Sequence, residues 1–226
     1  MVDDYYIDLE KITLDDYNER LDNTYIVKSR KILKENIGEK FKILKDYGIK
    51  NLQDCLSILK TKDNVKEFAE KSGLSEEYLT ILKREINSFK PNPLNFNKIP
   101  DITSAILKKL EKMGIKNTRK LFNKIKTKED RKEFSEQSGI SVEDLLELVK
   151  LTDLSRVKWI GPIFSRLFYE SGVDTVNKMT KAEPKELFIK LIEINKKNNY
   201  TKSNFTENDV MLCIDVSKDV PQAIEY

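Results

Sequence analysis

The stretch VKWIGPIFSRLFYESGVDTV, residues 157–176, decides the fold of this chain. It predicts a short helix, a tight turn at residues 159–161, and a second helix that Pro162 opens and Gly172 closes. Pro162 suits the first helical position because no backbone N–H is needed there, and we expect Gly161 to adopt a positive φ in the turn at no steric cost. Gly172 stands where a left-handed C-terminal cap belongs. A hairpin of two such short helices cannot bury its own apolar side, so we expect it to stack on copies of itself.

Copies of this pattern recur along the chain. The sequence KMGIKNT around Gly114 matches DYGIKNL around Gly48, and KEFSEQSGIS around Gly139 matches KEFAEKSGLS around Gly73. In both pairs the offset is 66 residues, from 48 to 114 and from 73 to 139. The sequence ESGVDTV around Gly172 is a weaker third version. These repeats, together with the absence of a convincing strand pattern, predict an all-α protein of about three helical units plus flanking helices.

Breaks in the helical pattern divide the chain into segments. Pro91 and Pro93 interrupt a long helix, because neither proline tolerates a preceding α conformation well, and they mark the best linker. The predicted segments are an acidic N-terminal lead with helices (1–36), a first unit (37–90), a linker (91–99), a tandem domain (100–220, with units 100–153 and 154–220) and a tail (221–226).

Composition limits the class of protein. Net charge is only +3, but residues 24–100 carry 16 basic and 10 acidic side chains, whereas residues 1–23 carry two basic and eight acidic ones. Cys55 and Cys213 lie in apolar helical patterns without a second cysteine nearby, which argues against a disulfide framework or a thiolate metal site. We find no signal peptide and no apolar run of membrane-spanning length, so we expect a cytoplasmic protein that binds no membrane.

Enzymatic chemistry is not expected. The chain has no histidine, so a general base would have to be Asp, Glu or Lys. It also lacks a glycine-rich loop that could hold phosphates and a spacing typical of metal ligands. The sequence therefore predicts a non-enzymatic protein with no cofactor, no metal and no small-molecule substrate.

The units of apolar residue, glycine turn and helix resemble the helix-hairpin-helix (SAM-like) superfamily. More narrowly, residues 99–220 are similar to the domain of unknown function family numbered 4332, with LTDLSR at residues 151–156 leading into the second hairpin of the pair. Residues 37–98 look like a further, divergent copy. The resemblance implies tandem helical hairpins, and it brings no established biochemical role.

The superfamily resemblance implies a way of holding nucleic acid. Such proteins in general use a Gly-apolar-Gly turn to grip DNA phosphates without reading sequence, since glycines let the backbone come close and N–H groups at a helix start bind anions. Here the three turns read NIG (36–38), DIT (101–103) and WIG (159–161). Each has lost the first glycine, and the second has lost both and gained an acid, so we expect the second turn to be the least suited to phosphate.

Basic residues near the first and third turns complete the hypothesis. The candidate nucleic-acid-binding residues are Lys34, Asn36, Gly38, Lys40, Lys42, Lys45, Arg156, Lys158, Gly161 and Arg166. The alternative is that the lysines lie on solvated helix faces and the third turn only packs. Trp159 could stack on a base, although we favour its filling the space between two hairpins. We therefore expect binding to DNA or RNA backbone, with a protein-interaction scaffold as the alternative.

Overall fold

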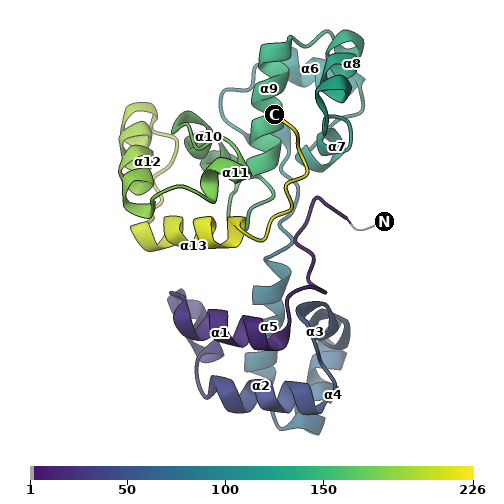
Figure 1. The fold of residues 1–226 in the computed structure, drawn as a ribbon, viewed down its shortest axis with the longest axis vertical. Coiled ribbons are helices and arrows are strands. Elements are labelled where there is room, and N and C mark those ends of the chain that lie inside the picture. The colour runs from purple at the N-terminus through teal and green to yellow at the C-terminus, as the bar shows by residue number, and fades with distance from the viewer. Residues whose placement is uncertain (1–2) are drawn as a thin grey trace. The chain divides into compact units, whose positions relative to one another are not determined.

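The protein is helical throughout the part that the structure describes. This computed structural model describes residues 3–226, which form helices and connecting turns and contain no strand, only two isolated β-bridges (Figure 1). The prediction of an all-α protein is confirmed. Within the described residues, no helix is both long enough and apolar enough to cross a membrane.

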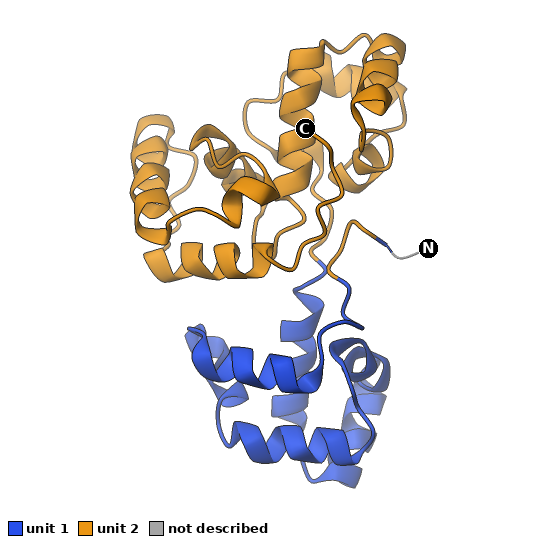
Figure 2. Cartoon of the chain, viewed as in Figure 1, with its two compact units in different colours: residues 1–3, 8–90 blue, residues 4–7, 91–226 orange. Residues whose placement is uncertain are grey.

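The chain divides into two compact units. Of the described residues, the first comprises residue 3 and residues 8–90, and the second comprises residues 91–226 together with the short segment 4–7 (Figure 2). The predicted linker, residues 91–99, belongs to the second unit rather than standing between the units. The reason is that its apolar side chains are packed, with Phe96 and Ile99 buried in the core of that unit.

The first unit contains five α-helices and a short 3-10 helix. Their bounds are α1 Leu14–Asn23, η1 Lys28–Leu33, α2 Ile37–Asp46, α3 Leu52–Ile58, α4 Lys62–Ser72 and α5 Glu76–Asn87. The helices of the predicted N-terminal lead are α1 and the 3-10 helix η1. Helix α1 packs against α2, so the predicted N-terminal lead is built into this unit.

The second unit follows with a 3-10 helix and eight α-helices. Their bounds are η2 Phe96–Lys98, α6 Ser104–Lys112, α7 Thr118–Phe122, α8 Lys128–Ser138, α9 Val142–Leu154, α10 Pro162–Glu170, α11 Val176–Met179, α12 Pro184–Asn198 and α13 Glu207–Ser217. Helix α9 contacts α7 and α8 before it in the chain and α10 after it, and so joins the two halves of the unit (Figure 1).

The same order of turns and caps occurs three times along the chain. The glycines after α2, α6 and α10, at positions 48, 114 and 172, have φ of +79°, +70° and +84°. The side chains of Asn51, Asn117 and Thr175 then cap the short helices α3, α7 and α11. Left-handed residues also end α4, α8 and α12, namely Gly73, Gly139 and Asn199. The repeat read from the sequence is therefore a repeat of helix ends.

An extended segment pairs with the start of the short helix in the first two repeats. Leu52 N donates to Ile12 O at 3.1 Å, and Thr118 N donates to Leu94 O at 2.9 Å. In the third repeat the equivalent amide, Val176 N, donates instead to Oδ2 of Asp153 at 2.9 Å. A buried carboxylate thus replaces a backbone carbonyl at this position.

Candidate nucleic-acid interface

Side-chain capping distinguishes two helix starts from all the others. Among the α-helices of residues 3–226, only α2 and α10 begin without a backbone N–H that donates to a capping side chain. The others are capped, and the capping residues are Thr13, Asn51, Thr61, Ser75, Thr103, Asn117, Thr127, Ser141, Thr175, Glu183 and Thr206. The first N–H groups of a helix have no partner within the helix, so those of α2 and α10 remain available to an external acceptor.

Helix α2 starts at the first predicted turn. Asn36 occupies the N-cap position but has φ of +48° and ψ of +41°, a left-handed conformation in which its side chain makes no capping hydrogen bond. Gly38 follows in the first helical turn, and a Cβ at this glycine would meet no atom within 4 Å. The backbone is therefore open at this position, although Glu39 places a negative charge in the same turn.

Most of the predicted lysines around α2 have partners within the protein. Lys34 Nζ donates to Asp22 O at 3.0 Å, and Lys45 Nζ lies 2.7 Å from the Asp15 carboxylate. Lys40 donates to a carbonyl of η1 and lies over the ring of a buried tyrosine. Lys42 is exposed and makes no ion pair or hydrogen bond with the described residues. Of the predicted lysines of this turn, Lys42 is the one whose charge is free to act on a ligand.

The second turn lies before α6 and is closed. The Thr103 side chain accepts from Ile106 N at 3.3 Å and so occupies the helix start. Asp101, with φ of +62°, holds its carboxylate against the Tyr200 hydroxyl, which donates to it. This contact also helps to raise the pKa of Tyr200, after desolvation by burial. This turn therefore combines a negative charge with an occupied helix start.

The third turn differs from prediction in its backbone. Gly161 was expected to adopt a positive φ, but it has φ of −85° and ψ of −177° and serves as the N-cap of α10. Trp159 carries the positive φ instead, at +68°. The left-handed conformation costs about 1–3 kcal/mol for a residue other than glycine. The turn thus places its strain on its largest residue, and the helix that follows keeps free N–H groups at Ile163 and Phe164.

Trp159 does not fill space between hairpins, so the favoured interpretation of this residue is wrong. It is 43% exposed, whereas its neighbours Lys158 and Ile160 are 1% and 2% exposed. Lys158 Nζ lies 4.1 Å from the centroid of the indole ring, and a cation at this distance is attracted by the ring. Lys158 and Ile160 anchor the turn in the core, and the indole of Trp159 remains at the surface.

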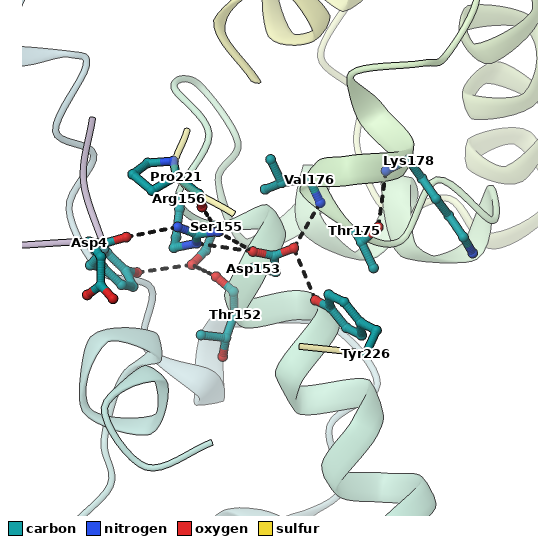
Figure 3. A network of polar contacts seen from close by, with 11 residues as sticks. Asp4, Thr152, Asp153, Ser155, Arg156, Thr175, Val176, Lys178, Pro221 and Tyr226 are labelled. Atoms are coloured by element: carbon teal, nitrogen blue, oxygen red, sulfur yellow. Dashed lines mark hydrogen bonds and ion pairs between the residues drawn. The ribbon is translucent and has the colours of Figure 1, made fainter. Parts of the chain in front are cut away.

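The two predicted arginines of the third turn are internal. Arg156 is 1% exposed and binds Asp153 Oδ1 through Nε at 3.1 Å and Nη2 at 2.5 Å (Figure 3). Its guanidinium also donates to Asp4 O at 3.1 Å and to Pro221 O at 2.9 Å. Arg156 therefore holds the segments at both ends of the described chain against α9, and it presents no charge to a ligand.

Arg166 is also buried, with its guanidinium bound to Glu147 at 2.8 Å and to Pro100 O at 2.9 Å. Together with the burial of Lys158, this leaves the third turn without an exposed predicted cation. The features of this turn that remain accessible are the half-buried Gly161 at the start of α10 and the exposed indole of Trp159.

Asp153 is a central residue that the sequence analysis did not single out. Its Oδ2 accepts from Val176 N at 2.9 Å and from the Tyr226 hydroxyl at 3.0 Å, in addition to the arginine on Oδ1. Burial, followed by the adjacent Asp153 charge, raises the pKa of Tyr226. An acid in the last turn of a predicted helix, three residues before an arginine, was the available signal. The described residues contain no cluster of side chains that could hold a metal ion.

Comparison with known proteins gives one match. No curated protein and no solved structure matches the chain. The family described as "Domain of unknown function (DUF4332)" matches residues 100–218, which is more than half of the 226-residue sequence and most of the second unit. Because the match covers more than half of the chain, the chain belongs to the DUF4332 family. The matched region runs from α6 to α13 and includes the second and third turns.

Proposed function

We propose that this protein is a non-enzymatic module that binds the sugar-phosphate backbone of nucleic acid without reading its sequence, through the starts of α2 and α10. One observation carries the proposal: these are the two α-helices of residues 3–226 that lack a side-chain cap. They coincide with two of the three predicted turns. An uncapped helix start combines free N–H donors with about half a positive charge from the helix dipole. Phosphate oxygens accept hydrogen bonds from such donors and carry the opposite charge.

We include in this proposal that the repeats are tandem helix-hairpin-helix units. Support comes from a shared backbone feature of the turns before α6 and α10. Asp101 and Trp159 both have a positive φ, and the N-cap residue follows two positions later in each case. A reducing cytoplasmic location is also part of the proposal, and the two cysteines, buried and unpaired, are compatible with it.

The expected affinity is modest. Exposed cations are few at both turns. Lys42 lies four residues after Gly38, and therefore on the same side of α2 as that glycine. Non-specific binding to nucleic acid typically has dissociation constants of about 10⁻⁴–10⁻⁶ M at physiological salt. We expect micromolar binding at low salt that weakens steeply as salt rises.

A substitution that supplies the missing cap tests the proposal directly. Gly161 already has the extended backbone of an N-cap, and a Cβ there meets nothing within 4 Å. Gly161→Asp should therefore fill the free N–H groups of α10 with a carboxylate and lower affinity for labelled oligonucleotides. Gly161→Ser fills the same groups without charge and should have a smaller effect.

Charge reversal at α2 provides the second arm. Lys42→Glu should weaken binding and reduce its salt dependence. The matched control is Lys66→Glu, an exposed lysine of the same unit on α4, whose start Thr61 caps. Equal effects of the two reversals, or no binding of the unaltered protein at about 50 mM salt, would overturn the proposal.

A protein-interaction scaffold is the second candidate. It is favoured by apolar side chains near α10 and α12: Ile189 is 47% exposed, and the half-buried Phe164 packs edge-on against Phe205 with ring centroids 5.2 Å apart. Failure to bind any oligonucleotide would direct attention to this alternative.

A further inference from the structure

We infer that Trp159 is a stacking platform for an unpaired base, so that the third turn selects single-stranded over double-stranded nucleic acid. The inference rests on the proposed function, because it names the form of nucleic acid that the start of α10 would hold. It concerns a different observation, namely the exposed indole and the buried ammonium beneath it rather than the missing cap.

The indole is held at the surface by its chain neighbours. Lys158 and Ile160 are buried, and Gly161 N donates to Trp159 O at 3.1 Å across the turn. A non-glycine residue with a positive φ is uncommon, and for a bulky side chain it is an outlier that calls for a functional explanation. Because both neighbours are fixed in the core, the ring cannot withdraw without opening the turn. It is thus oriented before any ligand arrives.

The start of α10 carries no negative charge that would repel an anionic chain with flat groups. The Lys158 ammonium lies 4.1 Å from the ring centroid, and the first turn of α10 contains no acidic residue. The N–H groups of Ile163 and Phe164 lie four and five residues after the tryptophan along the chain. A strand with unpaired bases offers a planar group for the indole and a phosphate for the helix start. In a duplex the bases stack on one another and leave only the backbone accessible.

The chain contains one tryptophan, so its fluorescence reports on this site alone. The experiment titrates the 226-residue protein at low salt with three probes of about 20 nucleotides: oligo(dT), an abasic strand with the same backbone, and a duplex. We expect oligo(dT) to bind most tightly and to quench the tryptophan emission. The abasic strand should bind more weakly, with little quenching.

Substitutions separate stacking from folding. Trp159→Leu should weaken oligo(dT) binding by about 5- to 150-fold, which corresponds to the roughly 1–3 kcal/mol of base–aromatic stacking. Binding of the abasic strand should remain unchanged. Trp159→Tyr keeps an aromatic face and should retain most of the affinity. The matched control is Tyr25→Leu, which removes an aromatic residue of similar exposure, 42%, from the first unit.

The outcomes distinguish the two proposals. If none of the probes binds, the proposed function fails. If oligo(dT), abasic strand and duplex bind equally, or if Trp159→Leu binds oligo(dT) as well as the unaltered protein does, the backbone-binding function stands and the stacking platform is overturned. Unchanged circular dichroism of Trp159→Leu shows that any loss of binding is not a loss of fold.

Discussion

Replacing Arg156 with methionine should be among the most destabilising single changes in the second unit. The side chain is 1% exposed and is paired with Asp153, whose own side chain is 4% exposed. Arg156→Met keeps the apolar length of the side chain but leaves a buried carboxylate without its cation. It also removes the donors that satisfy the carbonyls of Asp4 and Pro221. Breaking a buried ion pair from one side costs about 3–5 kcal/mol.

This magnitude is large enough to measure by thermal unfolding. A change of 1 kcal/mol moves the melting temperature by about 2–8 °C in domains of this size range, so we expect a decrease on the order of 10 °C for the transition of the second unit. Circular dichroism at 222 nm follows the loss of helix. The first unit, which contains none of these contacts, should melt at its usual temperature.

A double-mutant cycle shows whether the loss comes from the pair. Asp153→Asn removes the charge but can still accept from Val176 N and from the Tyr226 hydroxyl. If the uncompensated carboxylate causes the damage, Asp153→Asn should recover about 0.5–3 kcal/mol in the Arg156→Met background, as expected for coupled neighbours.

The Asp215–Lys218 pair provides a matched control. It has the same spacing of three residues, but its side chains are 42% and 57% exposed. Lys218→Met should cost no more than about 1 kcal/mol, because solvent screens an exposed pair. Equal losses of unfolding free energy in Arg156→Met and Lys218→Met, or a double mutant without coupling, would refute a special role for the buried pair.

Three further predictions concern other parts of the chain. Burial raises the pKa of both Cys55 and Cys213 to about 12, and the two cysteines lie in different units. Each thiol should therefore react with a maleimide only when its own unit opens. Mass spectrometry after pulsed labelling measures this reaction. Burial of Asp174 favours its protonated form, but hydrogen bonds from Lys150 and Lys178 outweigh this and lower its pKa. The pKa of Asp174 in the folded protein therefore lies below the usual 3.8. The stability that Asp174 contributes is present above pH 3.8 and is lost as pH falls below it. Acid unfolding of Asp174→Asn, compared with that of the unaltered protein, should lack this loss. Gly114→Ala should cost about 1 kcal/mol or more in chemical denaturation, since φ there is +70°.

The repeat could be predicted from sequence because its signals are local. A glycine such as Gly48 is recognised by its place after an apolar helix face, and a cap such as Asn51 by the residues that follow it. These signals depend on a few neighbours in the chain, so they survive without knowledge of the tertiary structure. The order of helices follows from them.

The candidate site could be predicted only in part, because burial of a charge is not a local property. Arg156 looks like a surface cation beside a turn, yet two of its acceptors, Asp4 O and Pro221 O, are 152 and 65 residues away in the chain. The positive φ of the third turn fell on Trp159 rather than Gly161 for a similar reason. Burial of Lys158 and Ile160 fixes the turn, and the glycine that could have relieved the strain serves as the N-cap instead.

These findings change which residues can report on function. At the third turn a charge-removal experiment on Arg156 or Arg166 would destabilise the unit and so mimic a loss of binding, since both guanidiniums are buried. A new cap at Gly161 acts in the opposite direction: it should raise stability by a few tenths of a kcal/mol while lowering affinity for an anion. Opposite signs for stability and binding arise only if the free N–H groups of α10 receive the ligand, because damage to the fold would lower both.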